Sequence, residues 1–116
     1  MTAMTRVAVF GATGTVGSAT VRRLLAKGDV EVVAVSRRPP ALVGDERLRH
    51  IAVDLRDASA VTDALRSAGP FTSVVYAALY EKPSLVSGWT DAEQIATNRA
   101  MFAHVLAAST RHRTCM

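Results

Sequence analysis

The feature that most constrains this chain is a glycine-rich turn at residues 11–17, with the sequence GATGTVG. The turn follows a short apolar run at residues 6–10 and precedes a helix-like run at about 15–27. Such a turn lets backbone N–H groups approach a pyrophosphate closely, and the helix N-terminus adds a partial positive charge. The last two glycines keep the G-x-x-G spacing of the dinucleotide fingerprint, while the first sits one place earlier than in G-x-G-x-x-G. A P-loop is excluded because no Gly-Lys-Ser/Thr follows the turn, so the pattern predicts a dinucleotide site, with an ordinary tight turn as the alternative.

The rest of the chain alternates between strand-like and helix-like segments. Apolar runs predict strands at 6–10, 31–36, 50–54 and 73–78. Three helices are predicted between them: one ended by Gly28, one from Asp57 as N-cap to Gly69, and one from Thr90 as N-cap to about Ser109. Strands this continuously apolar are typical of a parallel sheet covered by helices. With right-handed crossovers, the expected fold is α/β, a three-layer Rossmann-type half-domain whose sheet of about four strands has the order 3-2-1-4.

The last predicted helix contains a polar residue on its apolar face. Ile95, Phe102, Val105 and Leu106 form an apolar stripe, and Asn98 falls on that stripe. A buried carboxamide needs hydrogen-bond partners, because leaving it unpaired costs about 1–3 kcal/mol. The pattern leaves two interpretations open: an edge position satisfied by backbone or water, or a functional role.

This topology predicts a ligand crevice where the strand order reverses, between the first and fourth strands. Residues that follow the strand ends should face it. After the second strand these are Ser36, Arg37 and Arg38; after the third, Asp54 and Leu55; and after the fourth, Ala77, Ala78 and Leu79.

The arginines after the second strand indicate which dinucleotide is preferred. NAD sites place an Asp or Glu about 20 residues past the glycines, where this chain has Ser36, Arg37 and Arg38. A guanidinium pairs with a 2′-phosphate that a carboxylate would repel, so NADP(H) is favoured over NAD(H). The alternative is that one or both arginines are solvated loop charges. Asp54 can accept a hydrogen bond from the adenine amino group or, alternatively, cap the local turn.

Composition excludes several other classes of protein. At 116 residues there is room for one small domain, and no apolar run reaches the roughly 18 residues of a membrane span. The net charge is +4, but the arginines are dispersed and no aromatic pattern accompanies them, so nucleic acid is excluded as a primary partner. Cys115 is the sole cysteine, and the first five residues do not form a signal peptide. A reducing cytoplasm is therefore expected.

Taken together, these motifs resemble the N-terminal half of an extended short-chain dehydrogenase/reductase, the superfamily labelled NAD-dependent epimerase/dehydratase. The resemblance covers nearly all of residues 5–109 and rests on the glycine turn, Val53-Asp54-Leu55, Ala77-Ala78 and the helix at 98–106. Residues 74–81 with Trp89 and Asn98, and also Ser36-Arg37-Arg38-Pro39, are similar to the progesterone 5β-reductase/iridoid synthase-like branch, which uses NADPH.

The resemblance implies roles for individual positions. The residues implied around the pyrophosphate are Gly11, Thr13, Gly14, Thr15 and Val16, with Gly17 for helix packing. Those implied for the 2′-phosphate are Arg37 and Arg38, those beside the adenine are Asp54 and Leu55, and those near the nicotinamide are Ala77, Ala78 and Leu79. Asn98 matches the asparagine that family members have in this helix, which supports its functional interpretation.

One departure from the family pattern limits the expected activity. Reduction in this family resembles hydride transfer assisted by a Tyr-x-x-x-Lys pair, in which the lysine lowers the pKa of the tyrosine. Here Tyr80 lies four residues after Tyr76, and Ser84 lies four residues after Tyr80. The three histidines lack metal-ligand spacing. The chain is therefore expected to bind NADP(H) as part of an oxidoreductase or sugar-epimerase-like enzyme, without catalytic or metal-binding residues of its own.

The C-terminal segment, residues 110–116, is unlike a fifth strand and is expected to be an atypical tail. Residues 1–116 would then be one truncated NAD(P)-binding Rossmann domain, with the fourth strand an uncovered edge open to self-association. A small-molecule substrate is expected only if a C-terminal part completes the protein. The alternatives are a non-catalytic, dinucleotide-sensing regulator of the NmrA-like kind and an inactive gene remnant.

Overall fold

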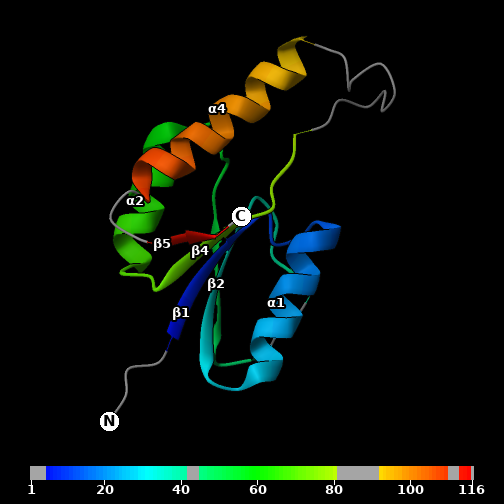
Figure 1. Cartoon of the computed structure of the whole chain (residues 1–116), viewed down its shortest axis with the longest axis vertical. Coiled ribbons are helices and arrows are strands. Elements are labelled where there is room, and N and C mark those ends of the chain that lie inside the picture. The colour runs from blue at the N-terminus through cyan, green and yellow to red at the C-terminus, as the bar shows by residue number, and fades with distance from the viewer. Residues whose placement is uncertain (1–4, 42–44, 81–91, 110–112, 116) are drawn as a thin grey trace.

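A computed structural model describes residues 5–41, 45–80, 92–109 and 113–115 (Figure 1). The elements in chain order are β1 (Thr5–Phe10), α1 (Thr15–Lys27), β2 (Val30–Ser36), β3 (Leu48–Ala52), α2 (Ala58–Ala68), β4 (Ser73–Tyr76), α4 (Ala92–Ala108) and β5 (Arg113–Cys115). The strands form one parallel sheet in the order β3-β2-β1-β4-β5. The predicted α/β class and the order 3-2-1-4 of the first four strands are confirmed.

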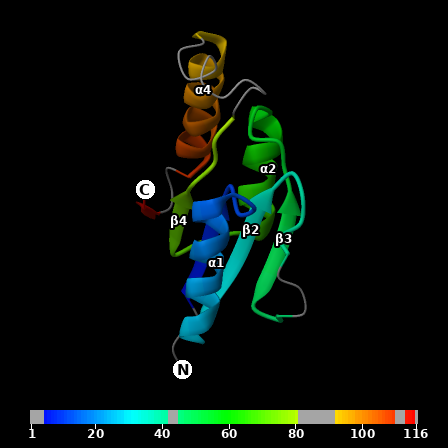
Figure 2. The same cartoon turned by 90° about the vertical axis from the view of Figure 1, so that its right-hand side faces the viewer.

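The sheet lies between two helical layers, with α1 on one face and α2 and α4 on the other (Figures 1 and 2). Successive residues of β1 serve both layers. Val7 and Val9 pack in the core under α1, while Ala8 and Phe10 pack in the core under α2 and α4. This burial on both faces explains why the strands are continuously apolar.

The signals that end and begin the helices act as predicted. Gly28 adopts a left-handed conformation with φ 84°, and its N–H donates to the carbonyl of Leu25 at 3.2 Å. The side chain of Asp57 accepts from the N–H of Ala60 at 3.1 Å and so caps α2. Residues 90 and 91, where the predicted capping box of α4 begins, lie outside the described residues.

β1 and β2 begin one residue earlier than predicted, and the bounds of the other two strands differ by two residues. The third strand spans Leu48–Ala52 in place of residues 50–54, and the fourth ends at Tyr76, before residues 77 and 78. Backbone bonding nevertheless continues past both ends, because the N–H of Val53 donates to Ser36 at 3.2 Å and that of Ala77 donates to Phe10 at 2.8 Å. The predicted site residues after these strands are thereby fixed to the sheet.

The prediction that residues 110–116 do not form a fifth strand is wrong for Arg113–Cys115. These residues pair in parallel with β4, and Arg113 lies opposite Ser73. Strand pairing needs only the backbone groups that the edge of β4 offers, so an apolar run is not required. Where it pairs with Arg113–Cys115, β4 lies between β1 and β5 and is therefore not the uncovered edge strand that was expected.

The buried face of α4 also differs from the predicted apolar stripe. Gln94, Met101 and Val105 are buried, whereas Ile95 and Leu106 are 56% and 45% exposed. The helix is apolar on several sides, so its neighbours in the fold determine which side is buried. None of the helices in the described ranges is long and apolar enough to cross a membrane.

Candidate functional site

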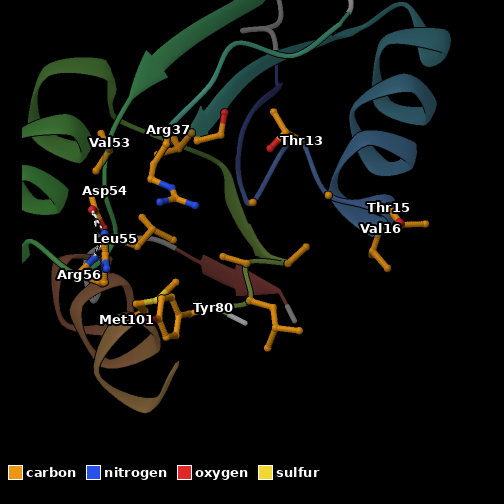
Figure 3. Close-up of a pocket in the computed structure, with 17 residues that line it drawn as sticks. Thr13, Thr15, Val16, Arg37, Val53, Asp54, Leu55, Arg56, Tyr80 and Met101 are labelled. Carbon is orange, nitrogen blue, oxygen red and sulfur yellow. Dashed lines mark hydrogen bonds and ion pairs between the residues drawn. The ribbon is translucent and has the colours of Figure 1, made fainter. Parts of the chain in front are cut away.

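A pocket of about 500 Å³ opens at the carboxyl ends of the strands, where the sheet order reverses between β1 and β4 (Figure 3). It is bounded by the glycine turn, by the segments that follow β2, β3 and β4, and by α4. Every predicted site residue lines it except Gly17, Arg38 and Asn98. The lining also includes five residues that were not predicted, namely Val35, Val53, Arg56, Tyr80 and Met101.

Two glycines of the turn are required by close packing within the protein. Gly11 has a φ of 81°, and a Cβ atom there would lie 2.6 Å from the backbone of Ala77 and Ala78. A Cβ atom on Gly17 would lie 1.9 Å from the carbonyl oxygen of Gly11. These contacts hold the turn against the segment after β4 and against the first turn of α1.

Gly14 differs from the other two because the protein itself leaves room for a side chain there. A Cβ atom on Gly14 would meet only the Gly11 carbonyl oxygen, at an ordinary 3.5 Å, and its φ of −75° is accessible to any residue. Gly14 is the N-cap of α1, no side chain caps this helix, and its first turn has no acidic residue. The N-terminal N–H groups of a helix lack intrahelical acceptors, so this end of the pocket is suited to an anion that approaches the backbone closely.

At the other end of the pocket, Asp54 forms an ion pair with Arg56 (Figure 3). Asp54 Oδ2 accepts from the Arg56 guanidinium at 2.7 Å, and Oδ1 accepts from the Arg56 backbone N–H at 3.0 Å. The side-chain hydrogen bond from Arg56 is the main reason why the pKa of Asp54 is lowered to about 2. The guanidinium also lies over the ring of Tyr80, 5.6 Å from its centroid. Asp54 thus caps the local turn, which was the alternative interpretation, while its carboxylate remains at the pocket wall.

The two arginines after β2 lie at different cavities. Arg37 lines the main pocket, and its positive charge contributes to the lowered pKa of Asp54. Arg38 lines a second cavity beside α1. The buried Ser36 fixes the backbone between them, because its Oγ donates to the Arg38 carbonyl at 2.5 Å and lies 3.2 Å from His50 Nε2.

Asn98 lies outside the pocket lining and holds a segment of its wall. Its Oδ1 accepts from the backbone N–H of Tyr80 at 2.6 Å, and its Nδ2 donates to the Tyr80 carbonyl at 2.8 Å. Nδ2 also lies 3.0 Å from the Gln94 carbonyl of the same helix. The carboxamide is therefore satisfied by backbone, and through Tyr80 it positions the chain that follows β4.

The histidines in the described part of the chain have structural contacts. His104 Nδ1 lies 2.9 Å from the carbonyl oxygen of Leu55, which ties α4 to the loop after β3. His50 contacts the side chain and carbonyl of Ser36, whereas His112 lies outside the described residues. Within those residues, no three His, Cys, Asp or Glu side chains gather in a group that could hold a metal ion.

Signals for two of the unpredicted lining residues were present in the sequence. Arg56 follows Asp54 by two residues in a loop, a spacing that allows the guanidinium to fold back onto the carboxylate. Met101 lies seven residues after Gln94 and four before Val105, on the helix face that proves to be buried. Neither pattern is distinctive enough to identify a site without the fold.

Comparison with known proteins places this architecture in a family. The model of the NAD dependent epimerase/dehydratase family matches residues 7–115. UDP-glucose 4-epimerase from Thermus thermophilus, solved in complex with NAD, is 30% identical with a TM-score of 0.71 over 91% of this chain and 34% of its own. The enzyme WbmH from Bordetella bronchiseptica, solved with NAD+, has the same fold at a TM-score of 0.75 and 23% identity, over 94% of this chain and 36% of its own.

A sequence relative is much longer than this chain. Polyketide synthase GfsA from Streptomyces halstedii is 44% identical over 86 residues, which cover 62% of this chain and 1% of that protein. The chain therefore spans only part of the proteins that it matches. Because the family model matches nearly its whole length, the chain belongs to the NAD-dependent epimerase/dehydratase family.

Proposed function

We propose that this chain binds a nicotinamide dinucleotide, with NADP(H) preferred over NAD(H), and forms the cofactor-binding part of an oxidoreductase or epimerase. The observation that carries the proposal is Gly14. This position lines the pocket, tolerates a Cβ atom within the protein and sits at an uncapped helix N-terminus. Close approach of a ligand phosphate explains a glycine there, whereas packing does not.

The remaining pocket residues match the other parts of a dinucleotide. Asp54 and Leu55 would contact the adenine, and the segment 77–79 would lie beside the nicotinamide. Leu79 is 63% exposed, so apolar surface is available to a flat ring at that end. When bound, the nicotinamide would supply hydride transfer, and the residues of this chain would bind and orient it.

The comparisons support the nicotinamide dinucleotide, and the arginines support the phosphorylated form. The 4-epimerase relative was solved in complex with NAD. In this chain the segment after β2 contains Arg37 and Arg38 and no carboxylate. A 2′-hydroxyl has no carboxylate partner in that segment, whereas a 2′-phosphate can pair with a guanidinium group from it.

This chain spans about a third of the length of the solved relatives, so the proposal for its own residues is limited to cofactor binding. Neither tyrosine of the sequence is followed by lysine at the fourth position, so we propose no proton-transferring residue in this chain. Dinucleotide sensing without catalysis is a second candidate function. Cofactor binding is common to both.

Isothermal titration of the purified chain with NADPH and with NADH tests the proposal. NADPH should bind with an affinity about tenfold or more above that of NADH, which corresponds to about 1.4 kcal/mol from one charge-assisted contact. Absence of binding by both nucleotides would overturn the proposal. Stronger binding of NADH would leave dinucleotide binding in place and refute the preference drawn from the arginines.

A further inference from the structure

A second cavity, of about 440 Å³, lies on the α1 side of the glycine turn. It is open to solvent on one side and is bounded by the turn, by the middle of α1 and by the segment that follows β2. Its polar and charged lining consists of Thr13, Ser18, Arg22 and Arg38. Thr13 also lines the main pocket, so the two cavities meet at the glycine turn.

The second cavity is positively charged. Arg22 comes from α1 and Arg38 from the segment after β2, and neither α1 nor residues 36–41 contain an acidic residue. Three other arginines, Arg6, Arg47 and Arg56, form ion pairs with Glu31, Asp45 and Asp54. No such pair is found for Arg22 or Arg38 among residues 5–41, 45–80, 92–109 and 113–115.

The local backbone keeps Arg38 at this cavity. The Ser36 hydroxyl donates to the Arg38 carbonyl at 2.5 Å, which fixes the chain where it leaves β2. Pro39 and Pro40 follow at once, line the cavity and restrict φ at both positions. Adjacent arginines therefore reach different cavities, Arg37 the main pocket and Arg38 the second one.

Two guanidinium groups and neighbouring hydroxyls, without a carboxylate, suit a phosphate monoester. Such a group carries up to two negative charges and accepts several charge-assisted hydrogen bonds. A phosphate on the adenosine ribose of a dinucleotide in the main pocket would need a site next to the glycine turn. The second cavity adjoins the turn at Thr13.

We propose that the second cavity receives the 2′-phosphate of NADP(H), and that Arg22 of α1 acts with Arg38 as a specificity-determining residue. Arg37 then faces the adenosine from the main pocket and contributes to binding of both dinucleotides. This inference rests on the proposed function and adds to it a residue that lies outside the strand-end segments.

Arginine-to-glutamine variants test this division of roles by calorimetric titration with NADPH and NADH. Arg22→Gln and Arg38→Gln should each weaken NADPH binding about tenfold or more, the loss of one hydrogen bond to a charged group, while NADH binding stays within about twofold. Arg23→Gln is the matched control, because Arg23 is adjacent and exposed but lines neither cavity. It should leave both affinities unchanged.

Inorganic phosphate distinguishes a cofactor subsite from an independent anion site. Added phosphate should compete more strongly with NADPH than with NADH in the parent chain, because the pyrophosphate end of the main pocket is common to both nucleotides. This difference in competition should disappear in Arg22→Gln. Phosphate that binds without weakening NADPH would overturn the inference, as would an Arg22→Gln variant with an unchanged NADPH-to-NADH ratio. In both cases the proposed function stands provided that the parent chain binds the nucleotides, whereas absence of nucleotide binding refutes the function itself.

Discussion

Substitution by alanine should separate the glycines needed for folding from the glycine needed for ligand approach. At Gly14 the added Cβ meets nothing closer than 3.5 Å and the φ of −75° suits alanine. Glycine is a better N-cap than alanine, so Gly14→Ala should lower the free energy of unfolding by about 1 kcal/mol or less. That corresponds to a fall in Tm of up to about 8 °C for a domain near this size.

Alanine substitutions at Gly17 and Gly28 show how large the loss of stability should be at glycines with other structural roles. At Gly17 the Cβ would lie 1.9 Å from the Gly11 carbonyl oxygen, so backbone must move. The cost expected for such overpacking is about 3 kcal/mol or more. Gly28 has a φ of 84° with no atom within 4 Å of its Cβ position, so alanine there costs about 1–2 kcal/mol from backbone conformation alone. Gly28→Ala is therefore a control of modest stability loss at a site outside the pocket.

The effects of these substitutions on NADPH affinity should rank differently from their effects on Tm. If a phosphate approaches the backbone at Gly14, Gly14→Ala removes at least one hydrogen bond to a charged group, worth about 1.5–3 kcal/mol, and weakens NADPH binding roughly 10- to 150-fold. Gly28→Ala should bind NADPH as the parent chain does. Circular dichroism melting and calorimetric titration measure the two quantities. A Gly14→Ala variant with parental affinity would refute the inference that this glycine makes room for the ligand.

Four other substitutions test the contacts around the pocket and the orientation of α4. The hydrogen bond from Arg56 keeps the pKa of Asp54 at about 2, against an ordinary 3.8. The contribution of this ionised pair to folding stability is therefore complete above pH 3.8 and is lost as the pH falls through 2. Arg56→Gln should return the pKa of Asp54 towards 3.8, as measured by NMR titration. Asn98→Ala should lower the free energy of unfolding in urea by about 1–3 kcal/mol, because it leaves backbone groups of the pocket wall unpaired. Met101→Ala should lower the free energy of unfolding by about 2–5 kcal/mol, because Met101 is only 7% exposed. Ile95→Ala should lower it by about 0.5 kcal/mol or less, because Ile95 is 56% exposed. Equal losses for the two variants would contradict the observed orientation of α4.

The sequence predicts the fold well where local signals agree. The glycine turn, the stop at Gly28 and the N-cap Asp57 each act within a few residues, so α1 is observed at the predicted residues and α2 begins directly after its cap. Alternation of strand and helix then leaves one topology for the first four strands. The position of the site could then be predicted from the topology, because the carboxyl ends of parallel strands meet at one edge of the sheet.

Features set by tertiary contacts were not predictable in this way. The apolar pattern of α4 includes residues on several sides, and the side that is buried carries the Asn98 contact to Tyr80 and the His104 contact to Leu55. The sequence does not distinguish Arg37 from Arg38, which line different cavities in the structure. The hydrogen bond from Ser36 to the Arg38 carbonyl, which fixes the backbone here, depends on the folded chain. The pairing of Arg113–Cys115 likewise depends on the edge that β4 presents and not on its own side chains.

The two ends of the main pocket are built differently, and this difference bears on how affinity and selectivity arise. The turn at the phosphate end is held by backbone contacts of Gly11 and Gly17, which would serve a pyrophosphate of either dinucleotide equally. The end near the adenosine is built from side chains, namely Arg37 and the exposed pair of Asp54 and Arg56. Arg37→Gln should therefore weaken both nucleotides together with little effect on Tm, whereas changes in the glycine turn should weaken both nucleotides and also lower Tm. The NADPH-to-NADH ratio should then depend on Arg22 and Arg38 at the second cavity.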